Sequence, residues 1–390
     1  MTARPVTPRL PPRVAINAIF LLPGMGGLDT YVRELVPELV RAAPRTRFSV
    51  YCSPAGREHL AKTDWASEVA LVSHSVFGIR GLKAITELTV LGALGSARAD
   101  LLHSVALTAP LATRAVNVVT IADTTWLHGA AIDPTTRLWR LVVPPVARRA
   151  DRLIAISHAG ARDIAGHLRI PADRIDVTLL GHARPASVQA VPELECRRRF
   201  ALGDGPLVLT VGTRKPHKNV LGLIAALPHV LQLEPRARLV LAGNATAHEV
   251  ALRAAVRDHG LEDSVSFLPF VDDAELEGLY ASAACFVLPS FNEGFGLPLL
   301  EAMGRGVPVA CSNASALPEV AGEAARYFDP SDPRQIGAVV AELLADSELR
   351  VQLRERGAAR AAQLTWSATA LATLDSYARA WAARQAGARQ

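Results

Sequence analysis

The sequence predicts two doubly wound α/β domains, each a parallel sheet with helices on both faces. Short β-rich runs alternate with helical patterns through both halves of the chain, the order that produces parallel sheets. The chain has 390 residues, whereas a single hydrophobic core stops growing at roughly 250–300 residues. Prolines and glycines cluster among polar residues at 183–205, a composition typical of a linker between the two halves.

The first half begins with an expected strand at residues 13–20, followed by a loop containing Gly26 and Gly27. A helix follows, because Tyr31, Leu35 and Leu39 are spaced by four residues and share one face. Further strands are expected at residues 48–51, 69–72, 101–103, 116–121 and 153–156.

The alternation restarts after the linker. Strands are expected at 207–211, 238–242, 265–268, 285–288 and 307–311, helices at 220–233 and 248–259, and helical structure from 333 onward with a final stretch at 367–384. In such sheets ligands bind beyond the carboxyl ends of the strands, so a cleft between the facing edges of the two domains is the expected site.

The composition is that of an ordinary globular protein: half of the residues are hydrophobic and a fifth are charged. No apolar run approaches the roughly 18–20 residues of a membrane-spanning helix, and the prolines near the start disfavour a secretory signal. We therefore expect a soluble, cytoplasmic protein. Four widely spaced cysteines with no CxxC pair indicate reduced thiols and no zinc site.

The formal charge of +5 is unevenly distributed, since residues 1–190 hold 22 basic and 14 acidic side chains. No dense basic stripe interleaved with aromatics is present, which argues against nucleic acid as a partner. Basic residues stand among apolar ones at 76–94 and 136–152. An anionic membrane surface, an anionic lipid-linked substrate and simple solvation of these arginines all stay open.

The most informative stretch is PSFNEGFGLPLLEAMG at residues 289–304, which begins where the strand at 285–288 ends. Gly294 and Gly296 allow a tight turn, and Pro298 suits the first turn of a helix. The free N–H groups of such a helix start can bind phosphate. Glu301, one or two turns into the helix, can accept hydrogen bonds from two neighbouring hydroxyls, as on a ribose; interaction with the helix dipole alone is the alternative.

A second constellation is VGTRKPHKN at residues 211–219, between a strand end and a helix start. Two of the four lysines, Lys215 and Lys218, lie here beside Arg214. Cations in this place can neutralise a diphosphate. The alternative is a loop of solvated charges.

With these residues the chain resembles the family 4 retaining glycosyltransferases, which have the GT-B fold of two Rossmann-like domains facing across a cleft. The specific mark is Glu-x7-Glu, here Glu293 and Glu301. Other matching segments are GGLD at 26–29, TIAD at 120–123, IAISH at 154–158, ALPEV at 316–320 and TWS at 365–367.

The resemblance implies a domain at 1–190 on the acceptor side, a donor domain at 191–365 and a helix at 366–390 that crosses back to the first domain. It assigns Glu301 to the ribose hydroxyls, Glu293 to the donor sugar and Lys218 to the diphosphate leaving group. Other residues implied at the site are Asp123 and Arg214 as catalytic groups, and Gly26, Gly27, Gly212, Gly294, Phe295, Gly296 and Leu297 on the donor side.

Two departures from the family pattern affect this assignment. Relatives often have an arginine where Thr213 or His217 stands, so Arg214 is taken as the substitute. They also often have a histidine at the position of Ala122, and His128 is the nearest candidate to replace it.

The expected function is retaining, metal-independent transfer of a hexosyl group from a nucleotide sugar to a glycan, glycolipid or small glycoside, as in cell-surface polysaccharide synthesis. No Asp-x-Asp motif and no cofactor signature is present. GDP-mannose is slightly favoured as donor, by analogy. Alternatives are a synthase of a soluble disaccharide or sugar phosphate and a catalytically silent nucleotide-sugar-binding homologue.

Overall fold

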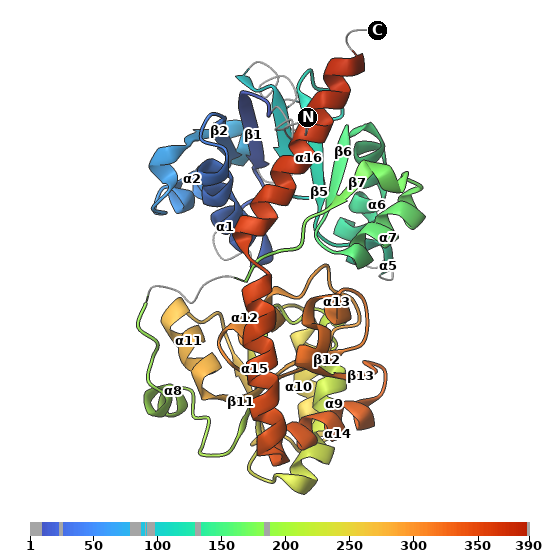
Figure 1. Ribbon diagram of the computed structural model, residues 1–390. Coiled ribbons are helices and arrows are strands. Elements are labelled where there is room, and N and C mark those ends of the chain that lie inside the picture. Colours follow the sequence, from blue (N-terminus) through green and yellow to red (C-terminus); the bar gives the residue numbers. More distant parts are fainter. Residues whose placement is uncertain are drawn as a thin grey trace, which may run out of the picture. The chain divides into compact units, whose positions relative to one another are not determined.

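A computed structural model of the chain describes residues 10–22, 26–78, 87–89, 91, 98–128, 134–182 and 188–387. The chain divides into two compact units (Figure 1). The first unit is Met1–Gly181 together with Thr365–Gln390, and the second unit is His182–Leu364. The linker expected at 183–205 begins two residues after the division, but it is not wholly irregular, since helix α8 (Glu193–Arg199) forms within it.

The described part of the first unit holds a seven-stranded parallel sheet in the order β3-β2-β1-β4-β5-β6-β7. Its strands are β1 (Arg13–Ala18), β2 (Arg47–Cys52), β3 (Ala70–Ser73), β4 (Leu101–Ser104), β5 (Val116–Ile121), β6 (Arg152–Ala155) and β7 (Ile175–Val177). Its helices include α1 (Gly27–Ala42), α2 (Pro54–Leu60), α5 (Thr125–His128), α6 (Pro134–Arg149) and α7 (His158–Leu168). Every residue of the interior strand β5 is buried, as expected for a strand covered on both faces.

The second unit holds a six-stranded parallel sheet in the order β10-β9-β8-β11-β12-β13, counted over its described residues. The strands are β8 (Leu207–Val211), β9 (Arg238–Ala242), β10 (Val265–Leu268), β11 (Ala283–Leu288), β12 (Val309–Ser312) and β13 (Ala325–Phe328). The helices are α8, α9 (Val220–Leu233), α10 (Glu249–Asp258), α11 (Asp273–Ser282), α12 (Leu297–Gly304), α13 (Leu317–Ala321), α14 (Pro333–Ala345) and α15 (Ser347–Gln363).

These two sheets confirm the predicted fold class of two doubly wound α/β domains. The strands that the sequence pattern predicts all form, with ends displaced by at most a few residues. The pattern does not predict β7 and β13. Both are short strands at the edge of a sheet, and β7 has Asp176 at its centre, so neither carries the apolar run that marks a buried strand.

The last helix, α16 (Trp366–Gly387), follows the second unit in sequence but packs on the first, against α1, β5 and β6. Figure 1 shows it in red along α1. The ring of Trp366 meets the ring of Tyr31 edge-on at 6.0 Å, and Thr369 Oγ1 donates to the carbonyl of Leu179 at 2.7 Å. Further along, Arg379 pairs with Asp176 of β7 at 3.1 Å.

A buried histidine fixes α16 to the sheet. His103 of β4 is fully buried, and its Nδ1 lies 2.6 Å from the hydroxyl oxygen of Tyr377 in α16. Its Nε2 lies 2.7 Å from Thr120 Oγ1 of β5. Burial lowers the pKa of His103 to about 3, so the imidazole is neutral in the folded protein.

The same sheet buries a carboxyl group near its topological switch point between β1 and β4. Glu87 is fully buried and accepts hydrogen bonds from Asn17 Nδ2 of β1 and from Thr108 Oγ1. Burial raises the pKa of Glu87 to about 8, although both hydrogen bonds act in the opposite direction. The group is therefore a neutral acid over most of the physiological range.

The free energy of unfolding is expected to depend on pH through both of these groups, and the two dependences have opposite signs. The folded pKa of His103 lies below the ordinary value, so its contribution to the free energy of unfolding is lost as pH falls from about 6.5 towards 3. The folded pKa of Glu87 lies above the ordinary value, so its contribution is lost as pH rises from about 4.5 towards 8.

Between pH 5 and 6 the two slopes oppose each other, each approaching about 1.4 kcal/mol per pH unit. Urea unfolding of His103→Gln should therefore show stability that falls as pH rises across this window, and Glu87→Gln stability that rises. Identical slopes in the two variants would contradict this prediction.

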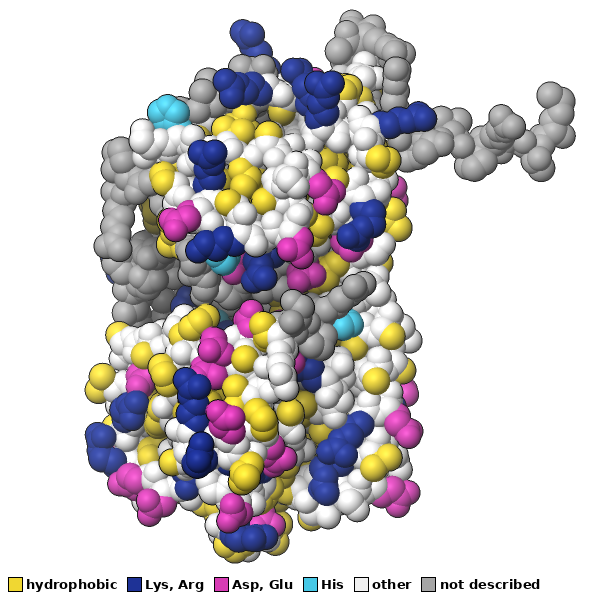
Figure 2. All heavy atoms as spheres, turned by 90° about the vertical axis from the view of Figure 1, so that its left-hand side faces the viewer, with side chains coloured by type: hydrophobic (Ala, Val, Ile, Leu, Met, Phe, Trp, Pro, Cys, Tyr) yellow, Lys and Arg dark blue, Asp and Glu magenta, His cyan; other side chains and the backbone are white. Residues whose placement is uncertain are grey.

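No described helix is both long and apolar enough to cross a lipid bilayer. On the face of each unit that Figure 2 displays, Lys and Arg side chains are interspersed with Asp and Glu rather than gathered in a stripe.

Candidate functional site

The second sheet reverses its strand order between β8 and β11, and a small hollow lies there at the carboxyl ends of the strands. This is the place where doubly wound sheets bind their ligands. The hollow is lined by Thr210, Val211, Gly212, Thr213, Arg214, Lys218, Val220, Leu241, Ala242 and Leu288. These residues come from the end of β8, the loop after it, the start of α9 and the ends of β9 and β11.

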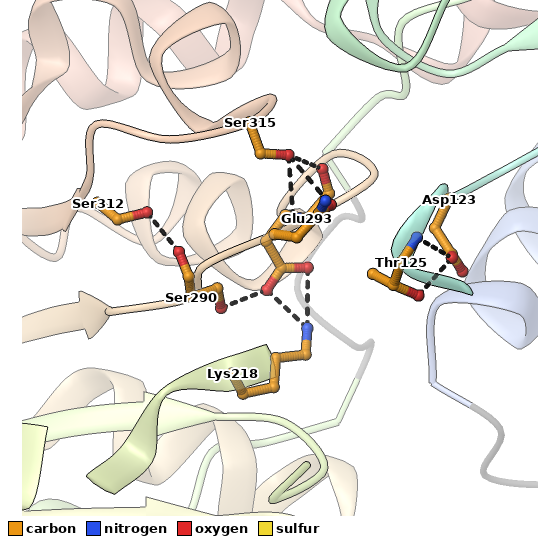
Figure 3. A network of polar contacts seen from close by, with 8 residues as sticks. Asp123, Thr125, Lys218, Ser290, Glu293, Ser312 and Ser315 are labelled. Carbon is orange, nitrogen blue, oxygen red and sulfur yellow. Dashed lines mark hydrogen bonds and ion pairs between the residues drawn. The ribbon is translucent and has the colours of Figure 1, made fainter. Parts of the chain in front are cut away.

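Lys218 reaches from this hollow to Glu293 in the loop after β11 (Figure 3). Its Nζ lies 2.7 Å from Oε1 and 2.8 Å from Oε2 of the carboxylate. Glu293 is 9% exposed, whereas the lysine side chain is 20% exposed. An ammonium has three N–H groups, and among the described residues only Glu293 accepts from this one. A donor is therefore left for an incoming anion.

Serine hydroxyls hold the loop that carries Glu293. Ser290 Oγ donates to Glu293 Oε1 at 2.6 Å, and Ser312 Oγ donates to the carbonyl of Ser290 at 2.6 Å. Ser315 Oγ donates to the carbonyl of Glu293 at 2.6 Å and accepts from its backbone N–H at 3.1 Å. Figure 3 shows these serines surrounding the carboxylate and its loop.

Asn219 connects the loop after β8, which carries Lys218, to the loop after β11. Its Nδ2 donates to the carbonyls of Pro289 and Pro330, at 3.0 and 2.7 Å, and its Oδ1 accepts from the N–H of Gly222 in α9. One buried amide thus caps α9 and ties it to the loop after β11. This fixes Lys218, the preceding residue, relative to the Glu293 loop.

The glycines predicted at the donor side form the turn into α12. Gly296 has a φ of 101°, and a Cβ there would lie 2.5 Å from Leu317, so only glycine fits. Gly294 is half-buried, and Phe295 and Leu297 are buried. Gly296 at the N-cap has no side chain to accept from the first turn, Pro298 has no N–H, and the N–H of Leu299 donates to the carbonyl of Gly296 at 3.0 Å, which leaves the N–H of Leu297 at this helix start for an anion.

Gly212 follows β8 with a φ of 145° and lies against the next strand end. Its N–H donates to the carbonyl of Ala242, and a Cβ on Gly243 would meet the oxygen of Gly212 at 2.3 Å. The two strand-end loops are therefore packed backbone to backbone at the floor of the hollow.

Glu301 lies in α12, half-buried, with Tyr280 and Arg305 beside it. The hydroxyl of Tyr280 donates to Glu301 Oε2 at 3.3 Å. Burial raises the pKa of Glu301, while Arg305 and the Tyr280 hydrogen bond act to lower it. The sequence analysis places Lys218 and Glu301 around one donor, but the carboxylate that Lys218 contacts is Glu293.

Arg214 lines the same hollow, and its guanidinium is also held by structural contacts. It is 4% exposed, and Nε donates to Glu249 Oε2 at 2.8 Å. Its Nη1 donates to the carbonyls of Leu241 and Leu268, the last residue but one of β9 and the last of β10. The guanidinium thus joins the ends of two strands to α10 and is occupied by these contacts.

The other predicted residues belong to the first unit. Gly26, with a φ of 64°, is the N-cap of α1, and Gly27 is its first residue. Asp123 Oδ1 accepts from the N–H of Thr125 at 3.0 Å and from its hydroxyl at 2.6 Å, so Asp123 caps α5. The side chain of His128 and most of residues 76–94 lie outside the described part of the chain.

Sequence reasoning misses the residues that support the site: Ser290, Ser312, Ser315, Asn219, Tyr280 and Glu249. Only Asn219 carries a local signal, because an Asn directly before an apolar helical run predicts a helix cap. Among the described residues, no three His, Cys, Asp or Glu side chains form a group that could hold a metal ion.

Comparisons with known proteins match both halves of the chain. The family model described as Glycosyltransferase Family 4 matches residues 25–181, and the one described as Glycosyl transferases group 1 matches residues 195–360. O-antigen chain mannosyltransferase B of Escherichia coli is 36% identical over 231 residues, 58% of this chain and 60% of that relative. The match thus spans about 60% of the relative's length.

Solved structures share the fold at low identity. A glycosyltransferase from Rickettsia africae matches with a TM-score of 0.74 at 13% identity, covering 94% of this chain and 98% of that one. Anabaena Alr3699/HepE in complex with UDP-glucose matches with a TM-score of 0.72 at 19% identity, covering 93% and 98%.

Proposed function

This chain belongs to the family 4-type glycosyltransferases with the GT-B fold, and we propose that it moves a hexosyl group from a nucleotide diphosphate sugar to a glycan or lipid-linked acceptor in cell-surface polysaccharide synthesis. The observation that carries the proposal is the Lys218–Glu293 pair at the switch point of the second sheet. A cation with a free donor, in a hollow at the carboxyl ends of the strands, suits a diphosphate leaving group.

In this proposal the diphosphate lies over Gly212 and the first turn of α12, with Lys218 offsetting the charge that develops as the bond between sugar and phosphate breaks. Glu293 orients the lysine and accepts from the sugar hydroxyls. The backbone of residues 294–297 contacts sugar and phosphate, and Glu301 binds the ribose. From the resemblance, Gly26 and Gly27 of the first unit are proposed as donor-binding residues and Asp123 as a catalytic group.

The proposed reaction keeps the anomeric configuration and needs no metal, since the leaving group is stabilised by Lys218 and by backbone N–H groups. The Glu-x7-Glu spacing of Glu293 and Glu301 is the feature of family 4 that supports retention. The name of the Escherichia coli relative makes mannose the first sugar to test. Its nucleotide is proposed to be GDP, with UDP as the next candidate because a neighbouring structure holds UDP-glucose.

A contact with an anionic membrane is proposed for α6, where the exposed side chains of Leu138 and Leu141 stand near the exposed Arg148 and Arg149. Apolar and basic side chains together suit an interfacial helix. Flotation with anionic vesicles at low salt tests this contact, and absence of binding would remove it.

A panel of nucleotide sugars, assayed for binding, slow hydrolysis and transfer, tests the proposed function. We expect one donor to bind and to be hydrolysed slowly without added metal and in the presence of EDTA. Binding without any turnover would indicate the catalytically silent homologue. No binding of any nucleotide sugar would refute the donor site.

Glu301→Gln should raise the dissociation constant of that donor about ten- to thirtyfold, because hydrogen bonds to an ionised acceptor are worth more than those to an amide. Isothermal titration measures the change. Glu342→Gln, which removes a carboxylate from an exposed ion pair with Arg326 in the same unit, serves as the matched control. Equal affinities of the two variants would contradict the ribose assignment.

A further inference from the structure

A group of interlocking side chains surrounds Glu301, and the resemblance assigns a role to none of them. Tyr280 of α11 is 1% exposed and donates to Glu301 Oε2. The guanidinium of Arg305 lies over the Tyr280 ring, 4.9 Å from its centroid, and donates to the backbone carbonyl of Glu301 at 3.1 Å. Glu277 of α11 binds Arg305 through Nε at 2.8 Å and also through Nη2.

The group leaves one face of the carboxylate unused. Among the described residues, Tyr280 is the hydrogen-bond donor to the Glu301 carboxylate, and it reaches Oε2 alone. Oε1 and the remaining lone pair of Oε2 are free to accept from two neighbouring hydroxyls. The Tyr280 ring is buried and is packed against both Arg305 and the Phe286 ring, whose centroid is 6.1 Å away, so its rotation is restricted.

We propose that Tyr280 and Arg305 are positioning residues that keep the Glu301 carboxylate ionised and oriented for the two hydroxyls of the donor ribose. The inference rests on the proposed function and adds to it the groups that make the half-buried Glu301 carboxylate a selective ribose ligand. Arg305, held by Glu277, supplies the nearby positive charge, and Tyr280 fixes the rotation of the carboxylate.

The electrostatics support this division of roles. Burial raises the pKa of Glu301, and the charge of Arg305 is the largest of the effects that lower it. The pKa of Tyr280 is raised well above its usual value by burial and by the Glu301 carboxylate, so the phenol keeps its proton and acts only as a donor. The other titratable groups that act on Glu301 are Glu277 and His182.

The first test compares ribose with deoxyribose. Titration of the protein with GDP, UDP and ADP and with their 2′-deoxy forms gives a ribose preference for each variant. Tyr280→Phe should reduce that preference about five- to tenfold, because the carboxylate loses the donor that orients it. Tyr327→Phe, which removes a tyrosine hydroxyl bonded to a carbonyl elsewhere in the same unit, should leave it unchanged.

The second test uses pH. Arg305→Met alone would remove the cation that Glu277 binds, so the variant is Arg305→Met with Glu277→Gln. Its affinity for the ribonucleotide should depend more steeply on pH than the parent affinity does, because without the charge of Arg305 the Glu301 carboxyl ionises at a higher pH. A retained unfolding midpoint shows that the fold is intact.

The outcomes separate the two proposals. If the parent binds none of the three ribonucleotides, the proposed function fails and this inference with it. If the parent binds one of them and its ribose preference is the same in Tyr280→Phe, the inference alone is overturned. Should Tyr280→Phe prove unstable, a pH dependence of the double variant no steeper than that of the parent would overturn it instead.

Discussion

Lys218→Met is expected to lower kcat about 10²–10³-fold while changing the dissociation constant of the donor far less. The ammonium is the cation that the structure places at the switch point with a donor to spare, and one preorganised donor aimed at developing charge is worth about this much. The negative charge on the diphosphate grows as the sugar leaves, so the loss falls mainly on the chemical step.

A second effect of the same substitution must be separated from catalysis. Glu293 is buried, and the substitution removes the cation that pairs with its carboxylate. Removing one partner of a buried ion pair costs about 3–5 kcal/mol of stability. Lys218→Met with Glu293→Gln removes both charges and should recover much of the stability without recovering kcat. Single-turnover rates of folded protein measure the catalytic part.

The neighbouring lysine provides the matched control. Lys215 lies three residues earlier in the same loop and is exposed, so Lys215→Met should change kcat less than twofold. Equal losses of kcat in the Lys215 and Lys218 variants would show that the loop contributes only its overall charge.

Arg214→Met should lower the free energy of unfolding by about 3 kcal/mol. The substitution leaves two strand-end carbonyls, of Leu241 and Leu268, without their donor and removes one of the cations that Glu249 binds. Each lost interaction lowers the free energy of unfolding strongly, because a buried polar group keeps its desolvation cost when its hydrogen-bond partner is removed. Urea denaturation at neutral pH gives the change in midpoint and slope.

Arg253→Met is the control for this prediction, since Arg253 binds the same Glu249 from the surface at 2.7 Å with a side chain 52% exposed. An exposed partner is worth less than about 1 kcal/mol. A fall in kcat of fully folded Arg214→Met, with stability unchanged, would return Arg214 to the catalytic role that the sequence suggests.

The fold could be predicted from the sequence because buried strands and amphipathic helices leave local patterns. The interior strands β5 and β8 are nearly continuous apolar runs, so their positions follow from composition alone. The edge strands β7 and β13 have no such run, although each pairs with the strand that precedes it in the sequence. Helix α8 arises within a proline-rich segment, where composition suggests a linker.

The candidate site could be predicted only as far as local chemistry reaches. The spacing in the sequence places Glu293, the glycine turn and Glu301 in one segment. Residue type does not distinguish Lys218 from Arg214, since both are cations of the same predicted loop. The structure distinguishes these two cations by their surroundings: one meets a carboxylate at the hollow, and the other is enclosed by strand-end carbonyls. Contacts over such sequence separations leave no periodic signal.

The position of α16 in the sequence has a consequence for synthesis of the protein. The helix completes the first unit, yet the whole second unit is translated before it. While the ribosome makes residues 182–364, the surface of the first sheet that will receive Tyr377 lacks its cover, and His103 lacks the phenol that meets it. Docking of α16 therefore follows synthesis of the second unit, and until then this part of the first unit leaves apolar surface exposed.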